Sequence, residues 1–470
     1  MRQALRAPGP YLALALFWAL SLALRPPIPP DETRYLTVAW EMYLRGDWAV
    51  PTLNGQPYHH KPPLLFWLID SVWTLLGPSR WAAGLVVLAT SCLSLFLATR
   101  VARSLFPDRR KVWERVAWVM AGTVPFVIYA TLILFDLLLT CCVLASFLAM
   151  VRLGRTGRWR YGVLAGLAIG LGVLAKGPVV VIHVAWPIAL YPLWRDAAMV
   201  PARRFLAGIA LALPAALVPV AVWLVPALLG TDGAFARALL WDQSAGRISG
   251  NMEASHPRPF WFYLALLPVL VLPWLLSPPV WRAVPGFRAR IAEAGRGLDR
   301  SRLRMLLAWA LGIVAVFSLI SGKQPHYVVP TIPLAAILVS YLLEAVPLRD
   351  IRRGSLVVLA LFVLFQVGAS RFLFPRFDLS AVAARLSSDP AVAVGFSGPY
   401  QGELNFLTRR TVPVQLVPLG TEMQWLNQHP DGFLVDVHPE SLQPPGEVVL
   451  RQPYRDDMVS VMRKPGGSAP

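Results

Sequence analysis

The sequence is poor in charged residues and has very few cysteines. Of its 470 residues, 15% are charged and 56% are hydrophobic, and the mean hydropathy is +0.54. A soluble globular domain carries about 25% charged residues, so that class is excluded. The three cysteines lie within apolar runs, which leaves neither a disulfide framework nor a CxxC metal motif. Acidic residues number 26 against 44 Lys and Arg, but the basic excess lies in short loops between apolar runs, so no nucleic-acid partner is expected.

Long apolar runs fill most of the chain. The runs at 11–24, 85–98 and 163–175 contain no charged residue, which is typical of helices that span a membrane. At roughly 20 residues per span, we predict an α-helical polytopic membrane protein with about eleven helices. Their expected bounds are 9–25, 80–100, 115–131, 133–151, 160–176, 178–194, 204–229, 259–280, 304–321, 325–345 and 354–372. The first run is expected to stay as a helix, because no small-residue cleavage site precedes Arg25.

The segments between these helices form two alternating sets. One set is short and rich in arginine, as at 100–115, 152–160 and 282–304, and the positive-inside rule makes it cytoplasmic. The other set therefore lies outside, and it includes a first outer loop at 26–79 and a later outer loop at 230–258. From about 373 onward, strand-length apolar runs at 391–396, 433–437 and 447–450 alternate with stretches of helical spacing. We therefore predict a membrane domain at 1–372 and a small soluble extracytoplasmic α/β domain at 373–470.

The first outer loop has an unusual density of ionisable residues. Asp31 follows two prolines and begins a stretch whose apolar stripe predicts a helix along the membrane interface to about residue 44. Asp31 is either an N-cap of that helix or part of a site, and its spacing alone leaves both open. His60 and Lys61 lie in a His-His-Lys-Pro-Pro run, which suits a metal and a phosphate but is as often only solvated.

Further polar residues fall on the same outer side. Asp136 lies among apolar residues of a membrane helix, which indicates a function by default, although an acid at a helix end also reaches water. Lys176 at a sharp turn either binds phosphate or extends to lipid headgroups. Other candidates on this side are Gln243, Arg247, His256, Lys323, His326 and Tyr327. Carboxylates and cations at one membrane surface favour a substrate that carries phosphate, with a carboxylate as general base.

The order of these motifs resembles a known family. The chain contains DETR, GDW, KPPLL, an intramembrane Asp, LAKGP, QSAGR, RPFWFY and SGKQPHY, across roughly residues 10–345. This order is similar to bacterial glycosyltransferases related to protein O-mannosyltransferases and the lipid A aminoarabinose transferase. The resemblance implies a GT-C fold with interfacial outer-loop helices. It also implies an inverting hexosyl or pentosyl transferase that takes a sugar from a polyprenyl (undecaprenyl) phosphate donor.

The resemblance implies roles for the residues that match the motifs. Asp31 would be the catalytic carboxylate and Asp136 a second acid. The lipid phosphate or sugar would be bound by Glu32, Arg34, Lys61, Lys176, Gln243, Arg247, Lys323, His326 and Tyr327. The implied acceptor is extracytoplasmic, either lipid A, another glycolipid or a protein, and the implied location is the bacterial inner membrane, with the site and the C-terminal domain on the periplasmic side.

One position departs from the family pattern. The aminoarabinose enzymes typically carry Glu before the KPP lysine, where this chain has His60. That Glu is associated with a divalent metal, and His60 with His256 would supply two imidazole ligands for zinc but no negative charge. A transporter or flippase of lipid-linked sugars is the alternative function. It predicts internal repeats and polar groups at mid-membrane, which the sequence does not show.

Overall fold

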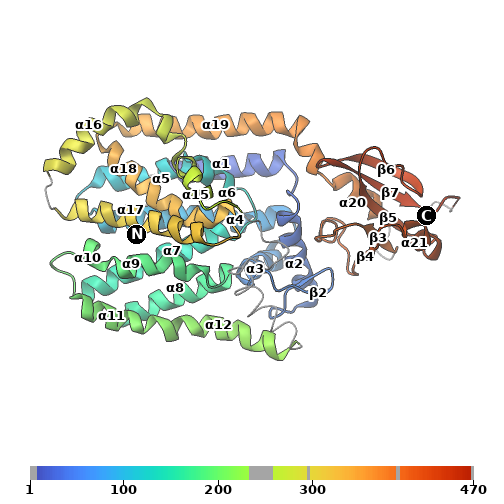
Figure 1. Cartoon of the computed structure of the whole chain (residues 1–470), viewed down its shortest axis with the longest axis horizontal. Coiled ribbons are helices and arrows are strands. Elements are labelled where there is room, and N and C mark those ends of the chain that lie inside the picture. Colours follow the sequence, from blue (N-terminus) through green and yellow to red (C-terminus); the bar gives the residue numbers. More distant parts are fainter. Residues whose placement is uncertain (1–7, 232–257, 294–296, 388–391, 467–470) are drawn as a thin grey trace. The chain divides into compact units, whose positions relative to one another are not determined.

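A computed structural model describes residues 8–231, 258–293, 297–387 and 392–466 (Figure 1). The chain divides into two units, and each is described by itself. The first comprises Met1–Ala19, His59–Leu65 and Gly84–Phe362, and the second Leu20–Tyr58, Phe66–Ala83 and Val363–Pro470. The second unit thus combines most of the first outer loop with the C-terminal segment, and the expected domain boundary at residue 372 stays a prediction.

The first unit is built from helices. Most are apolar along their whole length, and Figure 1 shows the long ones running along one another in this unit. In chain order, with helices α1, α4 and α19 continuing into the second unit, they are α1 (Gly9–Leu24), α4 (Arg80–Leu105), α5 (Arg110–Ala121), α6 (Val124–Tyr129), α7 (Asp136–Thr156), α8 (Arg160–Lys176), α9 (Val179–Ala189), α10 (Tyr191–Trp194), α11 (Ala202–Ala210), α12 (Ala212–Leu229), α15 (Phe262–Leu266), η3 (Val269–Val271), η4 (Trp274–Leu276), α16 (Pro278–Glu293), α17 (Leu298–Leu319), η5 (Pro325–Thr331), α18 (Ile332–Leu342), η6 (Leu343–Ala345) and α19 (Leu348–Phe372).

Six helical segments within the described residues are long and apolar enough to cross a membrane. They are Arg80–Leu105, Asp136–Thr156, Ala202–Leu229, Leu298–Leu319, Pro325–Ala345 and Leu348–Phe372. Four shorter apolar helices accompany them. The prediction of a multi-pass helical membrane protein is therefore confirmed, and the count of about eleven spans stays a prediction.

Some predicted helix bounds agree closely with the structure, and other predicted helices are broken into shorter segments. The helix expected at 160–176 is α8 (Arg160–Lys176), and the one at 9–25 is α1 (Gly9–Leu24). The expected continuous helix at 259–280 is instead interrupted. It consists of one short α-helix, α15, and two 3-10 helices, η3 and η4. Prolines recur there at positions 259, 268, 273, 278 and 279, and each lacks the backbone N–H that a continuous helix requires.

A row of small residues brings α8 against α12 of the first unit. A Cβ atom added at Gly166 would lie 2.3 Å from the carbonyl oxygen of Ala212, and one at Gly170 would lie 2.4 Å from that of Ala216. Only glycine permits such a close approach of two backbones, as in other packed membrane helices. This contact fixes the position of α8, whose last residue is Lys176.

The second unit contains two short helices of the first outer loop and a mixed sheet. Its complete elements are α2 (Asp31–Arg45), β1 (Thr52–Leu53), β2 (Gln56–Pro57), η7 (Phe374–Phe377), α20 (Ser380–Leu386), β3 (Val394–Ser397), β4 (Gln415–Val417), α21 (Glu422–Gln428), β5 (Phe433–His438), β6 (Glu447–Tyr454) and β7 (Asp457–Arg463), and it holds all but the start of α3 (Leu64–Leu76). The sheet order is β4-β3-β5-β7-β6, with β3 parallel to β4 and β5, and β7 antiparallel to β5 and β6. The predicted small α/β domain is confirmed, although the predicted strands did not include β4 or β7.

Helix α2 is anchored to the C-terminal part of its own unit. The Thr37 hydroxyl donates a hydrogen bond to the carbonyl of Gly402 over 2.7 Å, and the Trp40 indole donates to that of Arg410 over 2.8 Å. The Trp40 ring also meets Phe406 edge to face. The apolar stripe predicted for this helix exists, since Tyr35, Val38, Ala39 and Met42 are buried. Of the two alternatives left open for Asp31, the N-cap is wrong, because Asp31 is the first residue of the helix and Pro30 holds the cap position without a side-chain hydrogen bond.

Candidate active site

The predicted site residues are distributed over both units. The first unit holds His60, Lys61, Asp136, Lys176, Lys323, His326 and Tyr327, and the second holds Asp31, Glu32 and Arg34. The remaining three, Gln243, Arg247 and His256, lie outside the described residues. The roles predicted for all of these residues stay predictions, and the structure adds their surroundings.

Asp136 and Lys176 form a buried ion pair in the first unit. Asp136 is the first residue of α7 and Lys176 the last residue of α8, two helices that pack along each other. The Lys176 ammonium donates a hydrogen bond to a carboxylate oxygen of Asp136, and both side chains are buried. A carboxylate at a helix N-terminus and a cation at a helix C-terminus are both favoured by the helix dipoles. The sequence predicted both residues as site candidates but did not predict their pairing.

The segment at 323–327 adds aromatic and cationic groups beside this pair. The Lys176 ammonium lies 5.3 Å from the ring centre of Tyr327, a cation–π contact. Lys323 is buried and donates a hydrogen bond to the carbonyl of Arg258 over 3.0 Å. The Tyr263 hydroxyl donates to the carbonyl of Gln324 over 3.0 Å and accepts from its N–H over 3.1 Å. Tyr263 holds this turn in place, and its position in the aromatic RPFWFY motif was its only signal in the sequence.

The acidic end of α7 lies far from its basic end. Asp136 begins the helix, while Arg152 and Arg155 lie near its other end at Thr156. With a rise of 1.5 Å per residue, about 20 residues separate the two ends by roughly 30 Å, the thickness of a bilayer core. Helix α8 repeats the arrangement in reverse, from Arg160 to Lys176. The ion pair and the arginine-rich loops therefore lie at opposite ends of the first unit's helices.

In the second unit, Asp31 is half-exposed and held by neighbours on its own helix. The Tyr35 hydroxyl donates a hydrogen bond to a carboxylate oxygen of Asp31 over 3.2 Å, and Arg34 lies 3.8 Å from the same oxygen. The Asp31 side chain is 48% exposed, whereas that of Arg34 is 16% exposed. Burial lowers the pKa of Arg34, but Tyr58, Tyr35 and Asp31 raise it further, so the guanidinium stays charged. This arrangement offers an accessible carboxylate beside a fixed cation.

Glu32 points away from Asp31 into a buried ion pair. Its two carboxylate oxygens accept hydrogen bonds from the guanidinium of Arg25, and one also accepts from the N–H of Ile28 over 2.9 Å. Both side chains are buried, at 5% exposure for Arg25 and 2% for Glu32. Arg80 donates to the carbonyls of Leu22 and Arg25 where α1 ends. Arg25 and Arg80 were not among the predicted residues. From the sequence alone, a positive charge beside the end of a membrane helix indicates only how that helix is oriented in the membrane.

The described side chains give limited support to the zinc site predicted at His60 and His256. Among the described residues, no group of three or more His, Cys, Asp and Glu side chains is placed to hold a metal ion. The His60 ring lies 4.7 Å from that of His59, centre to centre, and His256 is outside the described part of the chain. Structural and catalytic zinc sites use three or four protein ligands. The described side chains near His60 therefore do not form a zinc site by themselves.

The chemistry available at these two groups is complementary. One group offers a buried acid–base pair with an adjoining tyrosine and a buried lysine. The other offers an exposed carboxylate beside a fixed guanidinium. Cations and phenol hydroxyls stabilise phosphate oxygens, and an exposed carboxylate accepts a proton or orients a nucleophile. This chemistry suits group transfer from a phosphate ester.

Comparisons with known proteins agree with the resemblance seen in the motifs. The family model described as dolichyl-phosphate-mannose-protein mannosyltransferase matches residues 60–223. The undecaprenyl phosphate-α-4-amino-4-deoxy-L-arabinose arabinosyl transferase 2 of Pseudomonas fluorescens is 30% identical over 375 residues, which cover 76% of this chain and 60% of that protein. The corresponding transferase of Pseudomonas aeruginosa is 30% identical over 356 residues, covering 74% and 60%. The chain thus spans about 60% of the length of the curated relatives it matches.

The fold also matches solved structures. The crystal structure of ArnT from Cupriavidus metallidurans bound to undecaprenyl phosphate has a TM-score of 0.73 to this chain, with 18% identity and 98% of both chains covered. The apo form of the same protein gives a TM-score of 0.72 with 19% identity, covering 96% of this chain and 97% of that one. The agreement confirms the predicted fold class. The chain therefore has the fold of ArnT, and over parts of its length it is similar to the protein mannosyltransferases and to the aminoarabinose transferases.

Proposed function

We propose that the chain is an integral membrane glycosyltransferase that moves a sugar from undecaprenyl phosphate to an extracytoplasmic acceptor. The observation that carries the proposal is the similarity to transferases named for undecaprenyl phosphate-linked aminoarabinose, at 30% identity over 375 residues. Those names make a pentose of the aminoarabinose type the first candidate sugar. The resemblance of the motifs makes lipid A the first candidate acceptor. Hexosyl transfer is the second candidate, supported by the match to the mannosyltransferase family model.

The proposed reaction is a direct displacement at the anomeric carbon. An acceptor oxygen attacks that carbon, the bond from the carbon to the phosphate oxygen breaks, and the phosphate leaves on the lipid. Asp31 takes the proton of an acceptor hydroxyl, or orients an acceptor that is already an anion, and its partial exposure supports this role. The configuration at the anomeric carbon inverts.

Cations stabilise the negative charge that develops on the leaving phosphate. Arg34, Lys61, Arg247 and Lys323 are proposed for this role, with Gln243, His326 and Tyr327 as hydrogen-bonding groups. Lys176 is already neutralised by Asp136, so we propose that the pair acts together, with Asp136 fixing the ammonium toward Tyr327. Glu32 is proposed to act through Arg25 in the same way.

The orientation follows from the charge distribution. We propose that the arginine-rich end of α4, α7 and α8 is cytoplasmic, and that Asp136, Lys176 and the C-terminal domain are periplasmic. The opposite placement of the ion pair and the arginines along α7 and α8 supports this orientation. Labelling single-cysteine variants in whole cells with a membrane-impermeant maleimide tests it. Label should reach a cysteine at Asp431, in the C-terminal domain, but not one at Arg158.

Zinc remains part of the proposal only as a metal ion that His60 and His256 are predicted to bind. No step of the reaction is assigned to it. Elemental analysis of the purified protein and of the His60→Ala variant tests the site. One zinc per chain in the wild type, lost in the variant, would support it, and wild-type protein without zinc would contradict it.

A transfer assay with defined substrates tests the function. Membranes containing the chain are supplied with undecaprenyl phosphate-linked 4-amino-4-deoxyarabinose and lipid A, and the product is measured by mass spectrometry. We expect product with the wild type and a loss of about 100-fold or more with Asp31→Asn. Asp47→Asn, on the same loop, serves as the control and should retain activity. A wild type that transfers neither this pentose nor a hexose, but moves the lipid-linked sugar across vesicles, would instead favour the flippase alternative.

A further inference from the structure

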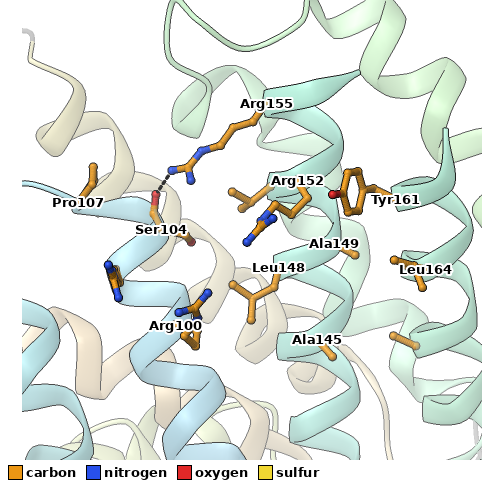
Figure 2. Close-up of a pocket in the computed structure, with 13 residues that line it drawn as sticks. Arg100, Ser104, Pro107, Ala145, Leu148, Ala149, Arg152, Arg155, Tyr161 and Leu164 are labelled. Carbon is orange, nitrogen blue, oxygen red and sulfur yellow. Dashed lines mark hydrogen bonds between the residues drawn. The ribbon is translucent and has the colours of Figure 1, made fainter. Parts of the chain in front are cut away.

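The basic end of the first unit's helices contains a pocket with an unusual charge pattern. The pocket has a volume of about 600 Å³ and lies between α4, α7 and α8 (Figure 2). Four arginines line it, Arg100 and Arg103 from α4 and Arg152 and Arg155 from α7. No acidic residue is among its lining residues in the described part of the chain. Four like charges around one cavity repel each other unless an anion compensates them.

Other arginines near this end of the unit have acidic partners. Arg109 is 2.9 Å from a carboxylate oxygen of Asp299 and 3.2 Å from one of Glu344. Arg302 is 3.1 Å from one of Asp196. In contrast, none of the four pocket arginines forms an ion pair within the described residues. Within the described residues, the fold therefore compensates Arg109 and Arg302 and leaves the four pocket arginines to an external anion.

Three of the four guanidinium groups are held in place by contacts that leave their positive charge without a compensating carboxylate. Arg155 donates a hydrogen bond to the carbonyl of Ser104 over 2.7 Å, drawn as a dashed line in Figure 2. Arg152 lies at the hydroxyl of Tyr161 from α8. The Arg103 guanidinium stacks over Trp113 at 5.2 Å. Such fixed guanidinium groups suit the planar, two-point recognition of phosphate oxygens.

The wall of the pocket changes from cationic to apolar along the helices. Ala145, Leu148 and Ala149 line it on α7, up to seven residues before Arg152, and Leu164 and Ala168 line it on α8. Seven residues of helix correspond to about 10 Å toward the middle of the unit. A ligand that fills this pocket therefore carries its negative charge at one end and an apolar chain at the other. A free phosphate ion leaves the apolar wall uncovered.

We propose that this pocket binds the headgroup of an anionic phospholipid, with the phosphate on Arg100, Arg103, Arg152 and Arg155 and an acyl chain along Leu148 and Leu164. Basic pockets between membrane helices on the cytoplasmic side bind such headgroups, and the cytoplasmic leaflet is rich in them. Four guanidinium groups favour a headgroup with two phosphates, such as cardiolipin, over one with a single phosphate. This site is distinct from the groups around Asp136 and Asp31, and the proposal does not depend on the proposed transfer reaction.

Lipid binding to the full-length protein in detergent tests the proposal. Native mass spectrometry counts bound lipid, and the unfolding temperature is followed by tryptophan fluorescence. The probes are tetraoleoyl cardiolipin, dioleoyl phosphatidylglycerol, dioleoyl phosphatidylcholine, undecaprenyl phosphate and inorganic phosphate. We expect the affinity to decrease from cardiolipin to phosphatidylglycerol to phosphatidylcholine, and inorganic phosphate to give no stabilisation.

Matched variants locate the site. Arg100→Gln and Arg152→Gln should each weaken cardiolipin binding about fivefold, since one arginine near a lipid phosphate contributes about 1 kcal/mol. Arg158→Gln, an exposed arginine at the same end that does not line the pocket, should leave binding unchanged. Ala149→Leu keeps every charge but fills the apolar wall, so it should weaken binding of both lipids and separates the pocket from a general surface charge.

Specific results would overturn the proposal. These are equal binding of phosphatidylcholine and cardiolipin, an equal effect of Arg158→Gln and Arg152→Gln, or full stabilisation by inorganic phosphate alone. Binding of undecaprenyl phosphate in preference to cardiolipin would also overturn it. If a glutamine variant does not fold, Arg100→Lys and Arg152→Lys preserve the charge, and they should lose less affinity than Ala149→Leu.

Discussion

The Lys176 ammonium is hydrogen bonded to the Asp136 carboxylate, and each side chain comes from the end of a different membrane helix. The two residues are 40 positions apart in the chain, and both are buried. Neither charge is stable alone in such surroundings, because a charge removed from water needs a partner of opposite sign. The pair therefore couples the folding of α7 and α8 to the charge state of the predicted site.

Breaking this pair should destabilise the protein more than removing it. Lys176→Met leaves Asp136 without its cation, and we expect a loss of about 3–5 kcal/mol in the free energy of unfolding. The double variant Asp136→Asn/Lys176→Met should recover most of this loss, because no buried charge remains. Unfolding of all the variants in detergent, analysed as a double-mutant cycle, measures the coupling. Additive effects of the two single changes would contradict it.

Substitutions at Asp31 and Glu32 should have different effects, one on activity and the other on stability. Glu32→Gln breaks the buried pair with Arg25, so we expect the free energy of unfolding to fall by about 3–5 kcal/mol. Asp31→Asn changes a side chain that is 48% exposed, so it should alter stability by less than about 0.5 kcal/mol while reducing transfer. Thermal unfolding and transfer by the folded fraction are measured on the same preparations. An Asp31→Asn variant that unfolds as readily as Glu32→Gln would show that Asp31 is structural.

The glycine row of α8 should tolerate no side chain. Gly166→Leu places a Cβ atom 2.3 Å from the carbonyl oxygen of Ala212, which forces α8 and α12 apart. We expect a destabilisation above about 3 kcal/mol, larger than ordinary overpacking of a core. Gly368→Leu is the matched control, because a Cβ atom at that helical glycine meets nothing within 4 Å. The yield of folded protein by size-exclusion chromatography compares the two variants, and equal yields would refute the packing argument.

Asp70 should make the stability of the protein depend on pH. Burial raises the pKa of this carboxyl group to about 8, and its Oδ1 atom has no hydrogen-bond partner. The helix that carries it, α3, has 13 residues and is too short to span a bilayer. Because the folded-state pKa exceeds the ordinary value of 3.8, the folded protein binds the proton more tightly, and stability falls as pH rises from about 4 to 8.

The Asp70→Asn variant removes this dependence. We expect its free energy of unfolding at pH 8 to exceed that of the wild type by about 1–3 kcal/mol, which is what an unsatisfied buried group costs. Its unfolding temperature should rise accordingly. At pH 4 the two proteins should be nearly equal, because Asp70 is then protonated in the folded state and close to half protonated in the unfolded state, so little of the difference in pKa is felt. Differential scanning fluorimetry from pH 4 to 8 measures the difference. A constant offset between the two proteins across this range would show that Asp70 is not the titrating group.

The sequence by itself determined the fold class, the resemblance to known glycosyltransferases and many helix bounds. Uninterrupted apolar runs with arginine-rich loops permit little other than a polytopic helical protein, and the run at 160–176 matches α8 to the residue. Strand-length runs near 433–437 and 447–450 likewise predicted β5 and β6. These features depend on the local composition and on the spacing of apolar residues, and both can be determined from a short stretch of sequence.

Only the tertiary structure decided which charges meet. Lys176 pairs with Asp136, Glu32 with Arg25, and Trp40 of α2 with the backbone of Arg410, and the Trp40 contact spans 370 positions. The interrupted segment at 259–280 also depended on structure, since its hydropathy alone favours a helix and its prolines decide against it. Packing likewise sets the contrast between Arg152, which has no acidic partner in the described part of the chain, and Arg302, which pairs with Asp196. A charge in the sequence has a sign, but its partner depends on which helix ends the fold brings within a few ångströms, because buried charges are stable only when such neighbours compensate them.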